Sequence, residues 1–253
     1  MEKICIVSRD RRFVYAEEYF IKNGYGCEIC DISSAKSGDI ILLSPKNELS
    51  DTELCRLLSN LNGGATVFTG DKKRAEKYYG GRIFDYSESE SFLLDNAYIT
   101  AQCAIKLTFE NSDFSLKGRQ ALVLGYGRIA KYLSSMLKSL GADIFIYARR
   151  EDARTDIRLS GFEACTLSEI SEIHPELVYN TVPYKIIERA VSDKFPKGAL
   201  VMELASEPGG FYDEKIALKG AGLPGKMMPR SAGKAIFDCV VSTLSRFERE
   251  NGI

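Results

Sequence analysis

The feature that most constrains this 253-residue chain is an apolar run that ends in a glycine-rich turn. Residues 121–124 read Ala-Leu-Val-Leu, and the pattern Gly125-x-Gly127-x-x-Ala130 follows directly. Gly125 permits a tight turn out of a strand, Gly127 leaves room for a pyrophosphate, and Ala130 lets a helix approach the sheet closely. The amides at the start of that helix and the positive end of its dipole form an anion site. The pattern predicts the phosphate-binding turn of a dinucleotide fold.

The residues after the turn support this prediction. Leu133, Leu137 and Leu140 recur at helical spacing, Gly141 is suited to end the helix, and residues 143–147 read as a second buried strand. An ordinary strand-turn-helix in another α/β protein is the alternative. The βαβ context favours the nucleotide site.

The end of the second strand bears on the choice of nucleotide. An acid about 20 residues past the first glycine would bind the ribose 2′-hydroxyl of NAD, but the sequence there is Tyr147-Ala148-Arg149-Arg150. Two guanidinium groups can hold a 2′-phosphate, so we expect NADP, with NAD as the other candidate. The alternative is that both arginines are solvated loop charges, and Glu151 weakens the NADP preference.

Short apolar runs alternate with helical patterns along the chain, which predicts an α/β fold with parallel sheets. Strands are expected over 3–8, 27–32, 39–44, 65–69, 121–125, 144–148, 177–180 and 200–204. Helices are expected over 11–23, 50–61, 91–110 and 231–250. We expect a bilobal protein with a smaller, flavodoxin-like α/β domain on the substrate side (1–95), a doubly wound Rossmann-type NAD(P)-binding domain (96–230) and a closing C-terminal helix (231–253). A substrate is expected to bind between the domains, facing the nicotinamide.

The composition argues against several classes of partner. Lys and Arg number 34 against 35 Asp and Glu, so the net charge of −1 gives no electrostatic reason to expect nucleic acid or an anionic membrane. The N-terminus enters a strand without a signal-like segment, and no apolar run reaches membrane-spanning length. We expect a cytoplasmic protein.

The cysteines and the histidine give little sign of metal or redox chemistry. The seven cysteines are scattered and odd in number, which predicts reduced thiols in apolar surroundings. Cys27-x-x-Cys30 falls inside an apparent strand, so a redox or metal role is disfavoured. His174 is the only histidine, which excludes a His-based metal cluster and favours a structural role for this residue. No metal is expected.

Two later loops carry residue types suited to a nicotinamide, because ligands of open α/β sheets bind at the carboxyl ends of the strands. In residues 179–183, Asn180 and Thr181 offer hydrogen bonds to the nicotinamide ribose or carboxamide. An ordinary strand end is an equally good interpretation of that loop. In residues 203–210, small residues and a Pro-Gly-Gly turn allow the backbone to approach a flat ring, with Ser206 as a donor.

The third loop, residues 222–234, is rich in glycine and proline and leads into a helix for which Ser231 is the expected N-cap. With free amides, its cations Lys226, Arg230 and Lys234 predict a site for a carboxylate substrate, aided by Arg9 or Arg12 of the first domain. The alternative for Arg230 is a structural salt bridge to the closing helix.

Four motifs together bring the chain close to a known family. They are Gly125-Tyr-Gly127-Arg128, Asn180-Thr181-Val-Pro183, Glu203-Leu-Ala-Ser206-Glu-Pro-Gly209-Gly210 and Gly222-Leu-Pro-Gly225-x-x-x-Pro229-Arg230-Ser231-Ala-Gly233. In this order and spacing, over about residues 95–250, they closely resemble the A subunit of dipicolinate synthase. That enzyme of spore-forming bacteria oxidises dihydrodipicolinate to dipicolinate.

The resemblance implies an NAD(P)-dependent oxidoreductase of sporulation with a dicarboxylate substrate and, as partner, a flavoprotein-like B subunit. We also expect a homo-oligomer. The expected catalytic residues are Ser206, Arg230 and Ser231. The expected cofactor-binding residues are Gly125, Tyr126, Gly127, Arg128, Ile129, Ala148, Arg149, Arg150, Asn180, Thr181, Val182, Pro183, Leu204 and Ala205.

Departures from the family pattern keep other functions open. Only about 95 residues precede the linker, and Ile99 and Gln102 stand where the family has a proline and a glutamate. A glutamine cannot act as a general base. The alternatives are an NAD(P)-dependent dehydrogenase or reductase of another small carboxylate, and a nucleotide-binding subunit without catalytic activity.

Overall fold

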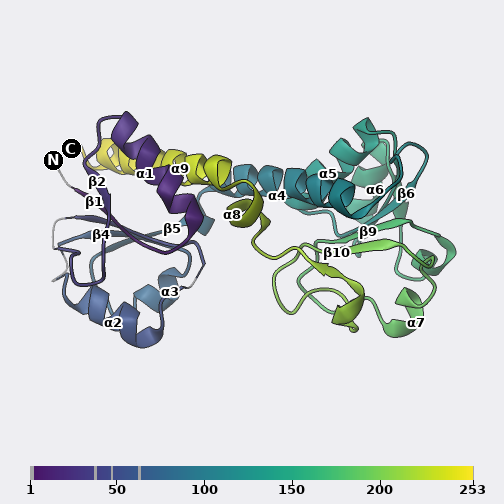
Figure 1. Cartoon of the computed structure of the whole chain (residues 1–253), viewed down its shortest axis with the longest axis horizontal. Helices are drawn as coiled ribbons and strands as arrows, with labels where there is room; N and C mark the ends of the chain where they lie inside the picture. Colours follow the sequence, from purple (N-terminus) through teal and green to yellow (C-terminus); the bar gives the residue numbers. More distant parts are fainter. Residues whose placement is uncertain (1–2, 37–38, 47, 62–63, 253) are drawn as a thin grey trace. The chain divides into compact units, whose positions relative to one another are not determined.

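The structure, a computed structural model, describes residues 3–36, 39–46, 48–61 and 64–252. The chain forms two compact units. Unit 1 is Met1–Asn96 with Pro224–Ile253, and unit 2 is Ala97–Leu223. Both are built on parallel sheets covered by helices, so the α/β class predicted from the sequence is confirmed (Figure 1). The expected closing helix is grouped with the N-terminal residues in unit 1.

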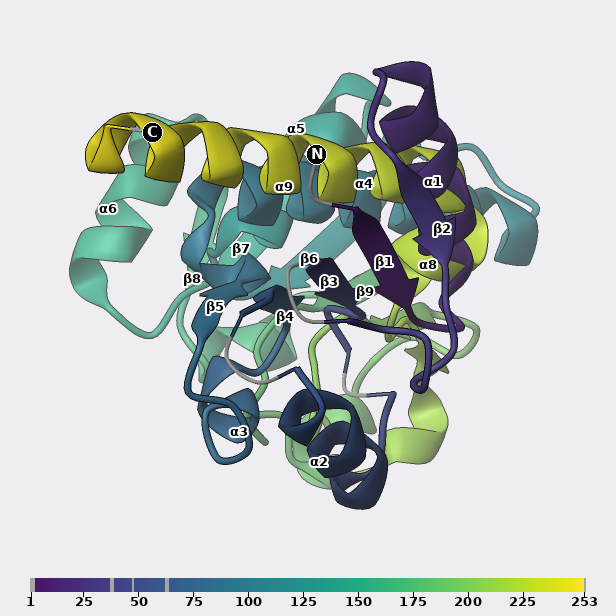
Figure 2. The same ribbon diagram turned by 90° about the vertical axis from the view of Figure 1, so that its left-hand side faces the viewer.

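Unit 1 holds a parallel sheet in the order β2-β1-β3-β4-β5. Its strands are β1 (Ile4–Val7), β2 (Cys27–Ile29), β3 (Ile40–Leu43), β4 (Thr66–Thr69) and β5 (Arg82–Asp85). Its helices are α1 (Arg11–Lys22), α2 (Asp51–Ser59), α3 (Lys72–Ala75), the 3-10 helix Tyr86–Glu88 and α9 (Pro229–Asn251). Figures 1 and 2 show α1 and α9 on one face of this sheet and α2 and α3 on the other.

Local contacts explain how α1 and α9 come together. A Cβ at Gly233 would lie only 2.4 Å from the backbone oxygen of Arg12, so a glycine in α9 allows the two helices to approach closely. Further along, the rings of Phe20 and Phe237 meet edge to face with centroids 5.0 Å apart. The terminal segment is thereby packed onto the first helix.

Helix α4 (Glu90–Asn111) carries the chain from unit 1 into unit 2. Unit 2 has the sheet order β11-β10-β9-β6-β7-β8. Its strands are β6 (Gln120–Leu124), β7 (Asp143–Tyr147), β8 (Glu163–Cys165), β9 (Leu177–Asn180), β10 (Leu200–Glu203) and β11 (Leu218–Lys219). Its helices are α5 (Arg128–Ser139), α6 (Glu151–Leu159), α7 (Arg189–Ser192), the 3-10 helices Glu169–Glu172 and Glu214–Ile216, and the start of α8 (Leu223–Met227). This is the doubly wound order, with its switch point between β6 and β9.

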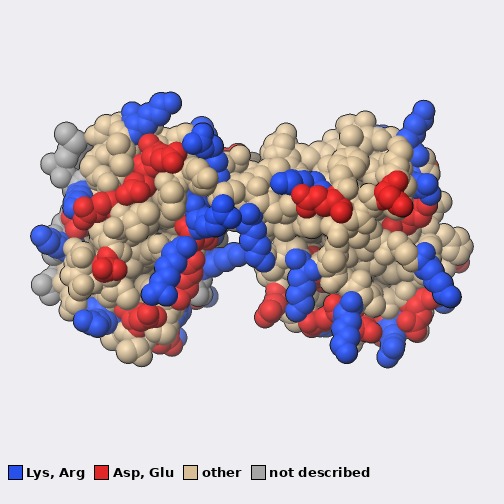
Figure 3. Space-filling model, in the orientation of Figure 1, with Lys and Arg blue, Asp and Glu red and all other residues tan. Residues whose placement is uncertain are grey.

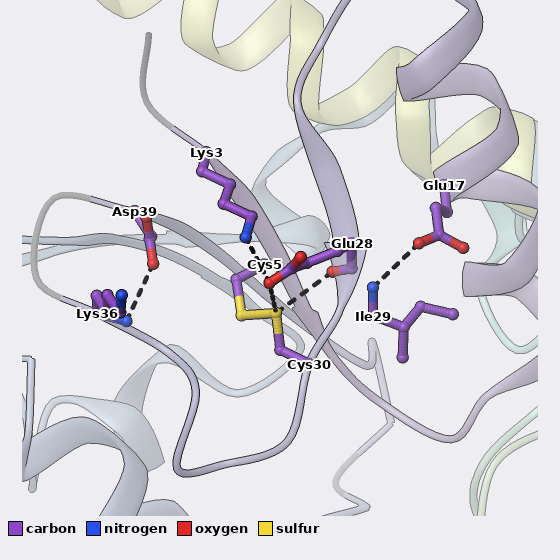
Figure 4. The surroundings of a disulfide bond; sticks show 8 residues. All are labelled: Lys3, Cys5, Glu17, Glu28, Ile29, Cys30, Lys36 and Asp39. Atoms are coloured by element: carbon purple, nitrogen blue, oxygen red, sulfur yellow. Dashed lines mark hydrogen bonds and ion pairs between the residues drawn. A yellow bond between two sulfur atoms is a disulfide. The ribbon is translucent and has the colours of Figure 1, made fainter.

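One pair of cysteines differs from the expectation of reduced thiols. Cys5 and Cys30 form a disulfide (Figure 4). Cys5 of β1 pairs in register with Glu28 of β2, and Cys30 lies two residues further on the same side, with its Cα 5.7 Å from that of Cys5. The prediction was wrong for these two residues because strand pairing joins positions that the sequence separates.

The partner of Cys30 is therefore Cys5 and not Cys27, which stays a free thiol. Burial and the nearby carboxylates of Glu17 and Glu28 raise the pKa of the Cys27 thiol to about 12. A protonated thiol is a poor nucleophile and a poor metal ligand. The raised pKa therefore favours the protonated thiol of Cys27 at neutral pH.

None of the described helices is both long and apolar enough to cross a membrane. Acidic and basic side chains are interspersed over the face drawn in Figure 3.

Candidate nucleotide site and the loops around it

The glycine turn joins β6 to α5 at the carboxyl edge of the unit 2 sheet. Gly125 has φ +100°, and a Cβ there would lie 2.6 Å from Thr181 Oγ1, so both conformation and space require glycine. Gly127 is the N-cap of α5, and no side chain caps the helix. A Cβ at Gly127 would meet nothing within 4 Å. Open space therefore lies before uncapped amides, which fits a pyrophosphate.

The other residues expected at this turn lie around it. Arg128 and Ile129 form the first turn of α5. Tyr126 precedes the N-cap, and the ammonium of Lys131 lies 4.5 Å from its ring centroid. Gly125 donates its backbone N–H to Tyr147 O at 2.9 Å, so the end of β7 lies directly beside the turn.

The charged residues after β7 differ in whether they have partners. Arg150 forms an ion pair with Asp152. Glu151 accepts from Arg154 Nε at 3.0 Å, and the hydrogen bonds and charges of the arginines of α6 hold the pKa of Glu151 below its usual value. No carboxylate of the described residues pairs with Arg149, which is exposed. The acid that argued against NADP is thus engaged within its own helix, and Arg149 is available.

Arg154 supports the turn of the candidate site and was not among the expected site residues. Its Nη1 donates to the backbone oxygens of Ala148 and Arg149, both at 2.8 Å. It therefore holds the turn that presents Arg149. Nothing in the sequence marks it out among the arginines of this helix.

The side chains of Asn180 and Thr181 form hydrogen bonds within unit 2. Asn180 is fully buried, and its Nδ2 donates to Val182 O at 2.8 Å and to Glu203 Oε1 at 2.6 Å. Its Oδ1 accepts from Val182 N at 3.1 Å. Thr181 Oγ1 donates to Leu124 O at 2.8 Å. Asn180 and Thr181 therefore shape the loop that ends in Val182 and Pro183, and their side-chain donors are already engaged.

Glu203 ties this loop to the next one and was not among the expected site residues. Its Oε1 also accepts from Ala205 N at 3.0 Å, and its Oε2 accepts from Gly210 N at 2.7 Å. A Cβ at Gly210 would lie 2.5 Å from Asn180 Nδ2, so the loop closes tightly over the amide. An acid at the end of a buried strand was the signal available in the sequence.

The expected catalytic residues fall in different units. Ser206 is exposed in the β10 loop of unit 2, and its backbone oxygen accepts from Gly209 N at 3.0 Å. Arg230 and Ser231 belong to α9 of unit 1. The expected capping role of Ser231 is wrong, because α9 begins at Pro229 and its N-cap is Met228, without a side-chain cap. Proline is favoured at the first helical position since its missing N–H needs no partner there.

Two of the three cations of the 222–234 segment already have acidic partners. Arg230 Nη2 lies 3.2 Å from Glu18 Oε2, and its guanidinium lies 5.4 Å from the ring centroid of Tyr15. Lys234 Nζ lies 2.6 Å from Asp238 Oδ2. The salt-bridge alternative for Arg230 thus has a structural basis, and its role toward a substrate stays a prediction.

Gln102 lies away from the glycine turn. It lines a groove of unit 2 with Met136 and Leu140, at the end of α5, whereas the turn lies where α5 begins. The groove side chains come from α4 and the C-terminal end of α5, and half of them are apolar. The change from glutamate to glutamine therefore does not remove a base beside the nucleotide turn.

Comparison with known proteins agrees with the motifs. No family model matches the chain. The A subunit of dipicolinate synthase from Bacillus subtilis (strain 168) is 30% identical over 175 residues, which are 65% of this chain and 58% of that protein. The chain therefore spans less than two thirds of the length of that relative.

Solved structures extend the likeness of fold. The dipicolinate synthase A subunit from Bacillus halodurans has a TM-score of 0.81 at 22% identity, covering 96% of this chain and 97% of that one. A transhydrogenase from Sinorhizobium meliloti has a TM-score of 0.74 at 17% identity, covering 97% and 94%. Identities this low establish the fold alone. The chain thus resembles the A subunit of dipicolinate synthase in sequence over 175 residues and in fold over nearly its whole length, as its motifs predicted.

Proposed function

We propose that this protein is an NADP-dependent oxidoreductase that oxidises dihydrodipicolinate to dipicolinate during sporulation. The observation that carries the proposal is the open, uncapped start of α5 at Gly127, in a chain that resembles the A subunit of dipicolinate synthase. Bound NADP would supply the hydride acceptor for aromatisation of the substrate ring, with release of a proton.

The residues of unit 2 bind and orient the cofactor in this proposal. Gly125, Gly127 and the first amides of α5 hold the pyrophosphate, and Arg149 contacts the 2′-phosphate. Asn180 and Glu203 fix the two loops that face the nicotinamide, and Ser206 offers a donor beside it. Because the reaction is driven by aromatisation, positioning of the two rings supplies most of the rate, and little covalent help is needed.

The substrate is a small dicarboxylate, and Arg230 and Ser231 keep their proposed catalytic roles until they are tested. A dehydrogenase or reductase of another small carboxylate is the second candidate. The third is a nucleotide-binding subunit without catalytic activity, which the glutamine at position 102 keeps open.

The partner is proposed from the resemblance alone. We infer a flavoprotein-like B subunit, a homo-oligomeric state and a cytoplasmic location. Co-purification of this protein with a B subunit tests the partner, and the mass of the protein in solution tests the homo-oligomeric state.

Turnover and cofactor titration test the function. Purified protein should convert dihydrodipicolinate to dipicolinate with NADP, and NADP should bind more tightly than NAD. Arg149→Ala should weaken NADP binding by roughly 10- to 100-fold, since a charge-assisted hydrogen bond contributes about 1.5–3 kcal/mol. Arg158→Ala removes an exposed arginine of α6, the helix that follows Arg149, and should leave affinity unchanged. Equal wild-type affinities for NADP and NAD would refute the NADP preference, and turnover of another carboxylate alone would select the second candidate.

A further inference from the structure

The carboxyl edge of the unit 1 sheet has its own topological switch point. The chain passes from β1 outward to β2 on one side, while β3, β4 and β5 follow on the other side of β1. The loops after β1 and β3 therefore diverge, and a crevice at such a point is where open α/β sheets bind ligands. Helix α1 also begins at this edge and directs its positive dipole end there.

A buried ion pair forms the floor of this edge. Arg12 Nε and Nη2 lie 2.9 and 2.5 Å from Asp10 Oδ2, and the two side chains are only 5% and 10% exposed. Asp10 Oδ1 accepts from Arg12 N at 3.0 Å and caps α1. Burial alone would raise the pKa of Asp10, but the hydrogen bonds and charge of Arg12 outweigh it and lower that pKa.

Helix α8 lies against this ion pair. A Cβ at Gly225 would lie 3.3 Å from Asp10 Oδ1 and 3.4 Å from Arg12 Nε, so the backbone of α8 passes directly over the pair. The next residue is Lys226, which is exposed. The ion pair thereby fixes where the Lys226 backbone lies.

Lys46 lies in the loop after β3, near enough for the charges of Asp10, Arg12 and Lys226 to act on its ammonium group. Its backbone N–H donates to the oxygen of Ser44, a buried hydroxyl, at 3.1 Å. Within the described ranges, no acid forms an ion pair with Lys46 or Lys226. Two unpaired ammonium groups thus accompany a guanidinium whose own partner is Asp10.

Lys46 is exposed, and two like charges act on its ammonium group. Partial burial, the charge of Arg12 and, to a smaller extent, that of Lys226 lower its pKa. Asp10 and Glu48 oppose this shift without cancelling it. A bound anion would offset this repulsion between like charges.

We propose that Lys46 and Lys226, backed by the Arg12–Asp10 pair, form a carboxylate-binding site of unit 1. The ligand class is a small organic acid, and its identification as a pyridine dicarboxylate rests on the proposed function. The two ammonium groups act as point charges toward a carboxylate, and the neutral Arg12–Asp10 pair positions the α8 backbone beside them.

Calorimetric titration of the full-length protein with dipicolinate tests the site, with and without NADP. The variants are Lys46→Gln and Lys226→Gln. Each should weaken dipicolinate binding by roughly 10- to 100-fold, the range of a charge-assisted hydrogen bond. Lys22→Gln is the matched control, because it changes the same charge at the opposite end of α1. It should bind as the wild type does, and NADP affinity should be unchanged in all four proteins.

Thermal midpoints separate binding from folding. Lys46→Gln removes repulsion, so its midpoint should equal or exceed that of the wild type. Wild-type affinity for dipicolinate in both lysine variants, or an equal loss in Lys22→Gln, would overturn the site.

Isophthalate and succinate serve as further probes. If the wild type binds one of these but not dipicolinate, and both lysine variants lose that binding, the result supports the site and contradicts the proposed substrate. If the wild type binds neither dipicolinate nor isophthalate nor succinate, the inference is wrong. Turnover of dihydrodipicolinate then tests the proposed function independently.

Discussion

The side-chain amide of Asn180 donates a 2.6 Å hydrogen bond to the carboxylate of Glu203, joining the ends of neighbouring strands β9 and β10. The same carboxylate accepts the backbone N–H groups of Ala205 and Gly210. One acidic group thus receives three donors from the two loops that the proposed function places around the nicotinamide. Charged acceptors with several donors are among the stronger hydrogen-bonded groups in proteins.

Glu203→Gln should loosen both loops. In glutamine, an NH₂ group replaces one of the two carboxylate oxygens, and it cannot accept a hydrogen bond. If it replaces Oε2, it faces the N–H of Gly210; if it replaces Oε1, it faces the donors of Asn180 and Ala205. We expect a loss of about 1–3 kcal/mol in the free energy of unfolding, the cost of leaving one buried donor unsatisfied, with weaker cofactor binding. Urea denaturation and cofactor titration measure the two effects. Glu207→Gln, an exposed acid of the same loop, is the control, and an equal change in both variants would contradict the role of Glu203.

Gly127→Val should abolish cofactor binding and leave the fold intact. Gly127 has φ −83°, which any residue can adopt, and a Cβ there meets no protein atom within 4 Å. The valine would occupy only the space proposed for the pyrophosphate. Gly80→Val also enters open space, but in unit 1, and controls for the substitution itself. A Gly127→Val protein with wild-type cofactor affinity would place the nucleotide elsewhere.

The sequence predicted the central strands and the edge strand β2, but not the edge strands β5, β8 and β11. The runs expected over 121–125 and 144–148 correspond to β6 and β7, because buried parallel strands are continuously apolar. The short strands β5 and β8 were not predicted, since Arg82–Asp85 and Glu163–Cys165 are only partly apolar and lie at sheet edges. Their pairing depends on a neighbouring strand that a local pattern does not contain.

The candidate site was likewise predicted only in part. The glycine turn could be predicted because backbone conformation and close approach restrict the residue type at those positions. The partners of Arg230, Lys234 and Asn180 could not be predicted, because a charge or amide in the sequence does not reveal whether another side chain already engages it. The disulfide of Cys5 and Cys30 was missed for a related reason, as only the strand register brings them together.

Arg230→Ala separates substrate binding from the ion pair with Glu18. Both partners are more than half exposed, at 69% and 54%, so the pair should contribute less than about 1 kcal/mol to stability. We expect Arg230→Ala to lower substrate use by roughly 10- to 100-fold, in line with about 1.5–3 kcal/mol for a charged contact, with a small change in the thermal midpoint. Glu18→Gln breaks the same pair but keeps Arg230, so it should retain substrate use close to wild type. Wild-type substrate saturation in Arg230→Ala would rule out the proposed role and leave only the salt bridge.

Asp10→Asn should destabilise the protein in a pH-dependent way. Asparagine is as good an N-cap as aspartate, so the loss comes from leaving the Arg12 charge without its partner. The two side chains are 10% and 5% exposed, and breaking a pair this deeply buried costs roughly 3–5 kcal/mol.

The pH dependence follows from the lowered pKa of Asp10 in the folded protein. A carboxyl group whose pKa is lowered by folding stabilises the fold at pH values above its pKa in the unfolded chain, which is about 4. This contribution is lost as the pH falls through the pKa of the folded state. The gap in unfolding free energy between wild type and Asp10→Asn should therefore be constant from pH 7 to 5 and shrink below about pH 4. Urea denaturation across this range measures it, with Asp31→Asn as an exposed control. A gap that stayed constant down to pH 3 would show that the charge of Asp10 does not stabilise the fold.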